Sequence, residues 1–577
     1  MEERPTERWG DVPQIGSPTP PPRWDDPRER HAGTAVRPRV PMAPFHRARS
    51  IREVAVMPVA APQPSGSPSD PAVRTAAGVV RGTREGSLAV FRGIPFAEPP
   101  VGSLRFAAPR AVRAWDGERQ ASAFGPPPPQ AGFFGMDERA REAAGHDWLT
   151  ANVWSPDPGP GAGLPVMVWI QGGAYVIGMS GLPEYDGGRL AREGGVVLVT
   201  FNYRVGIEGF AQIEGAPANR GLLDQVAALE WVRDNIRSFG GDPDRVTVFG
   251  ESAGGGSVAA LMAMGRARGL FHRAVAQSAP GTFFSPELAA DIATACASEL
   301  GLRPTTADLS SVDPIRLSGA GDALTAELAQ RVERWGLPAH RQIPFAPVVD
   351  GDVLPVTPWQ ALADGACRDV ELIAGHTRDK HRLFGLIDGT LGRATEEQAS
   401  AALRVYAPGP DGPQRYREAF PSADPNELYE LVHADWLFRM PSLHLAHAQL
   451  AGGGRAHVYE LTWPAPGMGG TLGACHGLDV PLVFGNLDAG QAAGLIGGAP
   501  SPEAEALSTH MRGAWTAFAT HGDPGWPAYD TTERLTQLFD TQPAVRPYPE
   551  EPSRLLWEDH VFPALPLIGQ EVSFGHT

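Results

Sequence analysis

Three stretches of the chain are apolar almost without interruption, and they constrain its fold more than any other feature. They are LPVMVWI at 164–170, VVLVTFNYRV at 196–205 and RVTVFG at 245–250. A strand that does not alternate between apolar and polar residues is typically buried on both of its faces. Such strands belong to parallel sheets that carry helices on both sides, so these runs predict an α/β chain.

Helical patterns follow and separate these strand candidates. RAVAQS, DVELIAG and AHVYELTW are three more apolar segments of strand length. The segment 501–522 has Ser501 in place for an N-cap and Pro502 in its first turn, as helices prefer. The segment after Gly221 places five apolar residues on one helical face: Leu222, Val226, Leu229, Val232 and Ile236. This alternation predicts a large, mainly parallel sheet flanked by helices on both faces.

The first 70 residues differ in composition from the rest. They are rich in Pro, Arg and Ser, as in SPTPPPRW and AAPQPSGSPSD, and lack apolar periodicity. We expect residues 1–70 to be a disordered tail, with a docking arm for a partner as the alternative. We expect one domain over residues 71–565 and a short C-terminal tail over 566–577.

Charge and composition argue against several classes of partner. The formal net charge of −17 makes nucleic acid an unfavourable partner. No apolar run reaches the roughly 18 residues that span a bilayer, and the first residues lack the apolar core of a secretory signal. The cysteines are Cys296, Cys367 and Cys475, an odd and sparse set that gives no disulfide framework. We therefore expect a cytoplasmic protein. The sequence has no CxxC or HExxH spacing, so we expect no metal site, and we expect no other cofactor.

Gly250-Glu251-Ser252-Ala253-Gly254 is the strongest chemical motif in the chain. G-x-S-x-G alone is weak in a glycine-rich sequence, but here it lies between a buried strand and a helical pattern. In that context a sharp turn lifts the serine hydroxyl above the edge of the sheet, where it can act as a nucleophile. The alternative is a Gly/Ser-rich helix start without chemistry.

A hydroxyl nucleophile also requires donors for an oxyanion and a base. The strand at 164–170 ends in Gln171-Gly172-Gly173, whose backbone amides can approach a substrate carbonyl and, with the Ala253 amide, form a three-donor oxyanion hole. Taken alone, the two glycines could equally be an ordinary turn. Among sixteen histidines, His476 is the favoured base because it lies in the loop segment GACHGLDVPLVFG, downstream of the serine.

Several segments together resemble the type-B carboxylesterase (cholinesterase-like) family, from about Val73 to Trp557. They are FRGIPFAEPPVGSLRF, NVWSP, GLLDQVAALEWVRDNIRSFGGDPDRVTVFGESAGG, FHRAVAQS, FAPVVDGDVLP and GACHGLDVPLVFG, in family order. The resemblance implies the α/β-hydrolase fold and a serine esterase. It assigns Ser252 as the nucleophile, His476 as the base, and the amides of Gly172, Gly173 and Ala253 as the oxyanion hole.

The chain departs from the family pattern at three places. His146-Asp147-Trp148 stands where the family has Glu-Asp-Cys, so a cysteine that forms a disulfide in secreted relatives is missing. Gln171 stands where the family usually has His. The family's triad acid is a Glu, and here the segment AGHTRDKHRLF has Lys380 at that position, the single lysine of the chain. A carboxylate orients the imidazole and stabilises its cation, whereas a nearby ammonium opposes that cation.

Three explanations for Lys380 remain open from the sequence. A Glu-to-Lys change could have silenced an ordinary esterase. Asp379, one residue earlier, could replace the acid after a shift of the loop. Alternatively, Lys380 could itself be a catalytic group, because desolvation can lower the pKa of a lysine and Ser–Lys pairs exist elsewhere.

The sequence therefore predicts a carboxylic-ester hydrolase whose activity is weak or altered because of Lys380. Two alternatives are a biosynthetic enzyme that uses Lys380 for acyl transfer, cyclisation or elimination, and a binding protein with a degenerate site. Four aromatic residues are candidates either for the walls of an apolar substrate pocket or for the core: Phe133, Phe134, Phe283 and Phe284. We expect a small, apolar ester or acyl substrate.

Overall fold

The computed structural model describes residues 70–130 and 146–569. Most of the expected N-terminal tail and residues 570–577 of the expected C-terminal tail lie outside this range. The chain divides into two units, Met1–Ser67 and Pro68–Thr577. The helices and strands described below all belong to the second unit.

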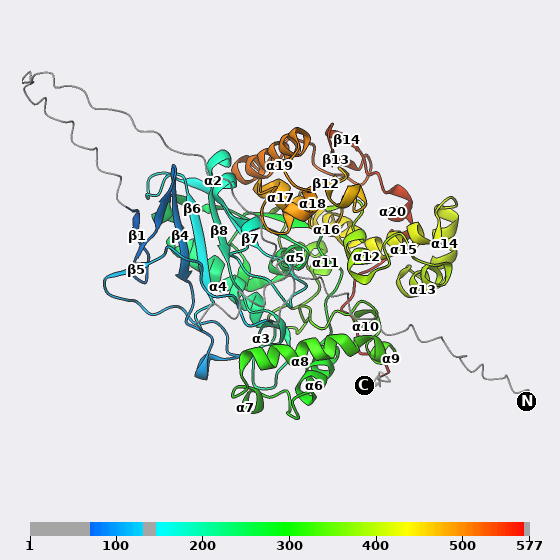
Figure 1. Ribbon diagram of the computed structural model, residues 1–577, viewed down its shortest axis with the longest axis horizontal. Coiled ribbons are helices and arrows are strands. Elements are labelled where there is room, and N and C mark those ends of the chain that lie inside the picture. The colour runs from blue at the N-terminus through cyan, green and yellow to red at the C-terminus, as the bar shows by residue number, and fades with distance from the viewer. Residues whose placement is uncertain (1–69, 131–145, 570–577) are drawn as a thin grey trace, which may run out of the picture. The chain divides into compact units, whose positions relative to one another are not determined.

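An eleven-stranded sheet forms the centre of this unit (Figure 1). Its strands, in spatial order, are β14 (Ala544–Pro547), β13 (Leu535–Phe539), β12 (Ala456–Leu461), β11 (Glu371–Thr377), β10 (Arg273–Gln277), β9 (Gly241–Glu251), β7 (Leu164–Ile170), β8 (Val197–Phe201), β6 (Thr150–Ser155), β4 (Leu88–Pro95) and β3 (Thr83–Glu85). A second, three-stranded sheet contains β1 (Ala72–Arg74), β2 (Val79–Arg81) and β5 (Glu118–Gln120).

In the eleven-stranded sheet, the strands from β8 to β13 pair in parallel, and the remaining pairings are antiparallel. This confirms the prediction of a mainly parallel sheet. The strand order reverses at β7, because β8 lies on one side of it and β9 on the other. Ligands of open α/β sheets bind at such switch points, beyond the carboxyl ends of the strands.

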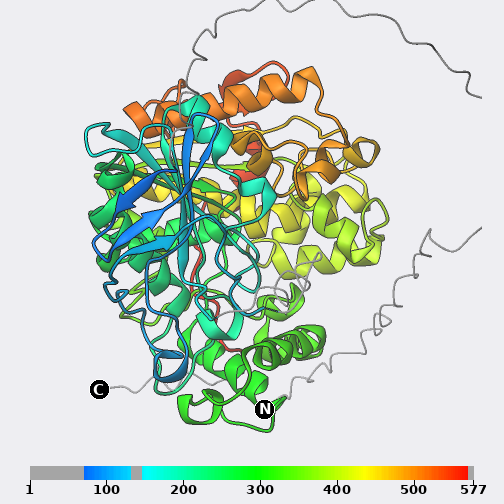
Figure 2. The same ribbon diagram turned by 60° about the vertical axis from the view of Figure 1, so that its left-hand side comes forward.

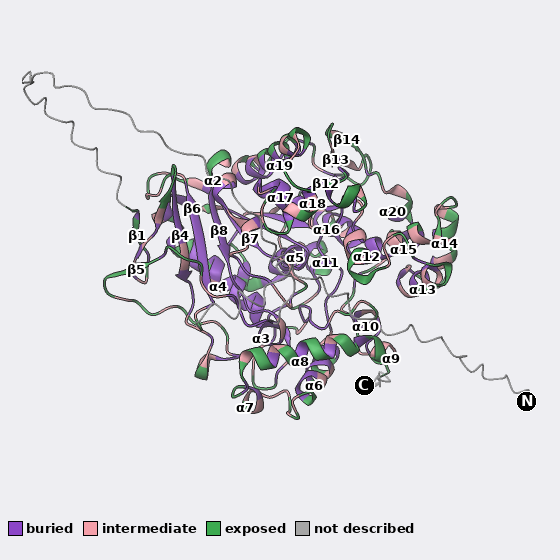
Figure 3. Ribbon diagram, in the orientation of Figure 1, coloured by how far each residue is buried: buried purple, intermediate pink, exposed green. Residues whose placement is uncertain are grey.

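Alternate side chains of each central strand belong to two separate cores. In β7, Val166, Val168 and Ile170 pack into one core, whereas Met167 and Trp169 pack into the other. Both sets are buried, as their unbroken apolar sequence predicts. Figure 3 shows these strands as buried, with exposed surface on outer helices.

Helices cover both faces of the sheet. The first core is closed by α4 (Arg220–Asn235), α5 (Ala253–Ala263) and α16 (Met440–Ala451), with α11 (Pro358–Ala363) packed on α5 and α16. The second core is closed by α2 (Gly188–Gly194), α17 (Asp479–Phe484) and α19 (Pro502–His521), which lie along the top of Figure 1 and reappear in Figure 2.

The other helices lie in the connections. They are α3 (Gly206–Phe210), α6 (Pro286–Ser298), α7 (Thr306–Leu309), α8 (Pro314–Glu327), α9 (Val332–Trp335), α10 (Leu337–His340), α12 (Arg382–Asp388), α13 (Glu396–Tyr406), α14 (Gly412–Ala419), α15 (Pro425–Ala434), α18 (Ala492–Ile496) and α20 (Glu551–Trp557). A π-helical turn, Asp435–Arg439, joins α15 to α16. Such turns are rare and often occur at functional sites.

Local sequence signals set most element boundaries. The Ser501 side chain accepts a hydrogen bond from the Ala504 amide at the start of α19, which confirms the predicted N-cap. The strand expected over 196–205 is shorter than predicted, since β8 ends at Phe201. The residues that follow turn away from the sheet, and Arg204 forms a buried ion pair with Asp224 of α4.

The described residues contain neither a membrane-spanning helix nor a cluster of metal ligands. No helix among residues 70–130 and 146–569 is both long and apolar enough to cross a membrane. Within the same ranges, no three His, Cys, Asp or Glu side chains gather as metal ligands do.

Candidate active site

Ser252 lies in a strained turn between β9 and α5. Its backbone has φ 60° and ψ −125°, a conformation that is unfavourable for a residue with a side chain. The Ser252 amide donates to the Gln277 carbonyl at the end of β10 over 3.0 Å, which fixes the turn to the neighbouring strand. Ser252 is 9% exposed. The predicted strand–turn–helix context of the G-x-S-x-G motif is therefore present.

Gly254, two residues after the serine, permits this turn. A Cβ on Gly254 would lie 2.0 Å from the Ile170 carbonyl oxygen at the end of β7. Only a residue without a side chain lets the start of α5 pass so close to the strand. This contact brings the N-terminus of α5 to the carboxyl end of β7.

The double glycine after β7 lies beside the serine. A Cβ on Gly172 would be 3.2 Å from the Ser252 Cβ, and Gly173 has a φ of 117° that favours glycine. Within the described ranges, the amides of Gly172 and Gly173 donate to no protein acceptor. The Tyr203 hydroxyl donates to the Gln171 carbonyl over 2.7 Å and holds the end of the strand. These free amides, together with the N-terminus of α5, can stabilise an oxyanion.

His476 lies in the loop between β12 and α17, at the same end of the sheet. Its ring lies against Phe384 of α12 and Phe438 of the π-helical turn, with centroid distances of 4.8 and 4.9 Å. Burial, and then the nearby Lys380 ammonium, lower the pKa of His476 well below its usual range. The imidazole is therefore neutral at pH 7, as a general base must be.

Lys380 follows β11 and is fully buried. Its Nζ donates to Glu251 Oε1 over 2.9 Å and lies 4.9 Å from the centre of the Phe438 ring. The ammonium is thus held in an ion pair with the residue that directly precedes Ser252.

Asp379 lies against the backbone of the loop that carries His476. Its Oδ2 accepts from the Ala474 amide over 2.8 Å, and its own amide donates to the Ala474 carbonyl over 2.9 Å. The Arg378 and Arg382 guanidinium groups lie 3.0 and 3.5 Å from its carboxylate. None of its contacts in the described part of the chain is to the His476 ring.

Glu251 is the residue of this site that sequence reasoning missed. Its Oε1 lies 3.5 Å from His476 Nδ1, as well as 2.9 Å from Lys380 Nζ. Burial raises the pKa of Glu251 to about 7, although the Lys380 ammonium opposes this shift. The sequence signal was the single lysine: an ammonium expected in a buried site requires a carboxylate nearby. Glu251 occupies a variable position of the G-x-S-x-G motif, and the motif assigns no role to the side chain there.

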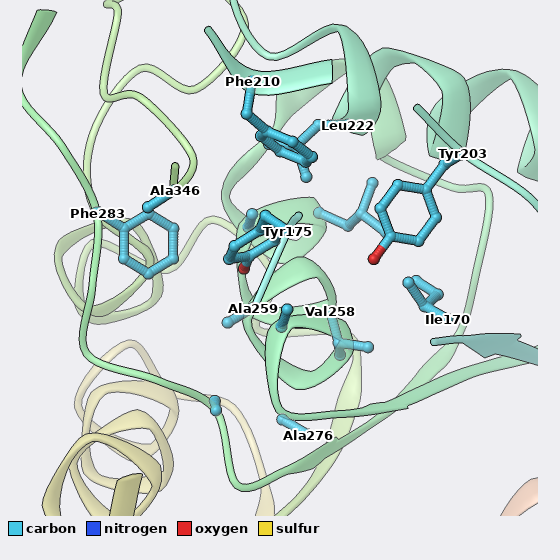
Figure 4. Close-up of a cluster of buried hydrophobic side chains, with 14 of the residues drawn as sticks. Ile170, Tyr175, Tyr203, Phe210, Leu222, Val258, Ala259, Ala276, Phe283 and Ala346 are labelled. Carbon is cyan, nitrogen blue, oxygen red and sulfur yellow. The ribbon is translucent and has the colours of Figure 1, made fainter. Parts of the chain in front are cut away.

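The aromatic pocket candidates fall into two groups. Phe283 and Phe284 are buried in the core, and Phe283 packs against Trp359 with a centroid distance of 5.5 Å. Figure 4 shows Phe283 among the buried side chains of this cluster. This arrangement favours the packing role for these two residues. Phe133 and Phe134 lie outside the described residues.

A mainly parallel sheet, a strained serine turn before a helix, and a histidine loop beyond a later strand define the α/β-hydrolase fold. The model of the carboxylesterase family matches residues 69–552, and the chain belongs to that family.

Several relatives are similar to this chain over most of its length. The para-nitrobenzyl esterase of Bacillus subtilis (strain 168) is 37% identical over 495 residues, which cover 84% of this chain and 97% of that protein. The fumonisin B1 esterase of Sphingopyxis macrogoltabida is 35% identical, over 79% of this chain and 84% of that protein. The crystal structure of a Geobacillus stearothermophilus carboxylesterase at pH 6.2 superposes with a TM-score of 0.74 at 35% identity, covering 84% of this chain and 99% of that one.

Proposed function

We propose that this protein hydrolyses carboxylic esters through a covalent acyl-enzyme on Ser252. The observation that carries this proposal is the strained Ser252 turn at the N-terminus of α5. Beside it lie the amides of Gly172 and Gly173, which donate to no acceptor among the described residues. Strained backbone persists where the surrounding structure maintains it, and it clusters at active sites.

The proposed reaction has two steps. The Ser252 Oγ attacks the ester carbonyl carbon while its proton passes to His476, and the amides of Gly172, Gly173 and Ala253 stabilise the oxyanion. The leaving alcohol takes the proton from His476 as the C–O bond to it breaks. Water then attacks the acyl-enzyme carbonyl carbon while its proton passes to His476. His476 returns that proton to Ser252 Oγ as the bond between Oγ and the acyl carbon breaks and the carboxylic acid leaves.

We further propose that hydrolysis is slower than in a site with a glutamate at position 380. The Lys380 ammonium disfavours the imidazolium that forms in each step, and it already lowers the pKa of His476. The Asp379 carboxylate, bound to the Ala474 amide and two arginines, supports the loop rather than the imidazole in this proposal.

The substrate is proposed to be a small, predominantly apolar ester. Two relatives are named for hydrolysis of para-nitrobenzyl and fumonisin esters, which supports the reaction type but not a particular substrate. A cytoplasmic location is proposed because Cys296, Cys367 and Cys475 are all free thiols, as a reducing compartment maintains them.

Both alternative functions are less well supported. A biosynthetic role for Lys380 requires a free amine that can reach the substrate, but the Nζ is buried and donates to Glu251. A binding protein does not require strained backbone at Ser252, nor amides at Gly172 and Gly173 that donate to no acceptor in the part of the chain that the structure describes.

Replacement of Ser252 tests the proposed hydrolysis. We expect Ser252→Ala to lower kcat on p-nitrophenyl acetate by at least about 10³-fold, as loss of a nucleophile does in serine hydrolases. Ser257→Ala, in the same helix, is the control and should keep most of the activity. Equal rates in the Ser252→Ala and parent proteins would contradict the proposal.

A further inference from the structure

We propose that Glu251 replaces the missing triad acid: its carboxylate orients His476 and stabilises the imidazolium, and Lys380 holds that carboxylate in place and ionised. Glu251 is thus a positioning residue that acts through His476. This inference rests on the proposed hydrolysis at Ser252 and concerns the same site.

The Glu251 carboxylate lies close to the His476 ring. Glu251 Oε1 lies 3.5 Å from His476 Nδ1, the nitrogen that faces away from the reacting atoms when Nε2 acts as base. Within the described part of the chain, His476 Nδ1 is buried and has no hydrogen-bond partner. A movement of a few tenths of an ångström brings the pair into hydrogen-bond range, and catalytic hydrogen bonds are often long before substrate binds.

The Glu251 side chain is held in place by its neighbours. The Glu251 carboxylate accepts from Lys380 Nζ over 2.9 Å and also from the Gly477 amide, next to His476 in the chain. Its backbone is fixed at the end of β9, immediately before Ser252. One carboxylate is therefore tied both to the strand that presents the nucleophile and to the loop that carries the base.

The charge of Lys380 has two opposing effects on this arrangement. It disfavours the His476 imidazolium, but it also favours the ionised form of Glu251, whose pKa burial raises to about 7 even with the ammonium present. Without the ammonium, that pKa rises further and Glu251 is neutral at pH 7. A neutral carboxyl cannot stabilise an imidazolium as an anion does. We therefore infer that Lys380 helps catalysis more by keeping Glu251 ionised than it hinders catalysis by repelling the His476 imidazolium.

Asp379 is the competing acid, and its contacts point elsewhere. Its carboxylate is bound by the Ala474 amide and by two guanidinium groups. It is held to the backbone of the loop, whereas Glu251 faces the ring of His476.

The ionisation of Glu251 depends on the groups around it. Five titratable groups of the described residues face its carboxylate. They are Lys380 after β11, His476 before α17, Asp479 in α17, Tyr459 in β12 and Tyr185 before α2. Asp479 raises the pKa of Glu251, and Lys380 lowers it. The two tyrosines have raised pKa values because they are buried, so they remain neutral near pH 7.

The pH profile of the parent protein is the first test. If hydrolysis requires ionised Glu251, kcat/KM falls as the pH drops through about 7, the pKa of that carboxyl. If it requires only neutral His476, the fall comes well below pH 6.5. A profile that stays flat from pH 8 down to pH 6 would overturn the inference.

Glu251→Gln is the second test. The amide keeps the size of the side chain and removes its charge, so we expect kcat to fall by about 10²–10⁴ with KM little changed, as loss of a triad acid does. The limb of the pH profile near 7 should disappear. Glu208→Gln, which removes the charge from the buried Arg105–Glu208 pair, is the matched control and should leave the profile unchanged.

Lys380→Met is the third test, because the competing account predicts the opposite sign. We expect activity at pH 7 to fall at least about tenfold, since the ammonium that keeps Glu251 ionised is lost, and to recover as the pH rises above 8. If Lys380 only obstructs the imidazolium, the same variant gains activity at pH 7, and the inference fails. Labelling of Ser252 by a fluorophosphonate probe in the parent protein separates the proposed hydrolysis from the proposed role of Glu251. If Ser252 is not labelled, the proposed hydrolysis is refuted. If Ser252 is labelled and Glu251→Gln is as active as the parent protein, only the role of Glu251 is refuted.

Discussion

At the scale of single residues, the buried Glu251 and Lys380 and the partly buried His476 form one cluster. The ion pair between Lys380 and Glu251 has almost no contact with solvent, and its ammonium lies against the Phe438 ring. Removing one member of a buried pair leaves an uncompensated charge and costs about 3–5 kcal/mol. Changes at position 380 therefore affect stability and catalysis together, and both have to be measured.

Lys380→Glu tests how much acid function the parent protein already has. We expect kcat on p-nitrophenyl acetate to rise by about tenfold, because Glu251 already supplies part of the ~10⁴-fold contribution that a triad acid makes. The melting temperature should fall, since two carboxylates then share the site without a cation. A gain close to 10⁴-fold would mean that the parent site had no working acid.

At the scale of elements, the sequence predicted the parts of the site that local patterns encode. The strand 164–170, the helix after Gly221 and the serine turn follow from apolar runs and from glycines at required positions. The contact between Glu251 and Lys380 joins residues 129 positions apart. It arises only when β9 and β11 lie on either side of β10, so no local pattern could predict it.

Gly254→Ala tests the close approach of α5 to β7. Its Cβ would lie 2.0 Å from the Ile170 carbonyl oxygen, so we expect a loss of about 1–3 kcal/mol or more, as overpacking of a core costs, with reduced turnover. Gly265→Ala is the control, because a Cβ there meets nothing within 4 Å. Urea denaturation of both variants measures the difference; equal stabilities would show that the start of α5 is not held against β7.

At the scale of the whole molecule, the residues before Asp70 are proposed to be dispensable for the fold. At the start of the described residues, the Gly82 amide donates a hydrogen bond to the Pro71 carbonyl, and the Arg81 guanidinium donates one to the Asp70 carbonyl. Cutting before Asp70 keeps both bonds.

Deletion of residues 1–69 should leave the melting temperature within about 2 °C of the parent value, the shift that ~1 kcal/mol produces in a domain of more than 150 residues. The sequence of this segment has no apolar periodicity with which to bury a core face. Differential scanning calorimetry of the two proteins makes the comparison. A fall of many degrees would indicate that the segment docks on the domain.

The central claim, covalent catalysis by Ser252, is tested most directly by trapping the acyl-enzyme. The protein is mixed with p-nitrophenyl acetate, quenched in acid during turnover and digested, and the acetylated peptide is located by mass spectrometry. We predict that the acetyl group is found on Ser252. If Glu251→Gln slows deacylation more than acylation, a larger fraction of that variant than of the parent protein carries the acetyl group. Turnover that leaves Ser252 unmodified while acetyl accumulates on Lys380 would contradict the account and make the lysine the nucleophile.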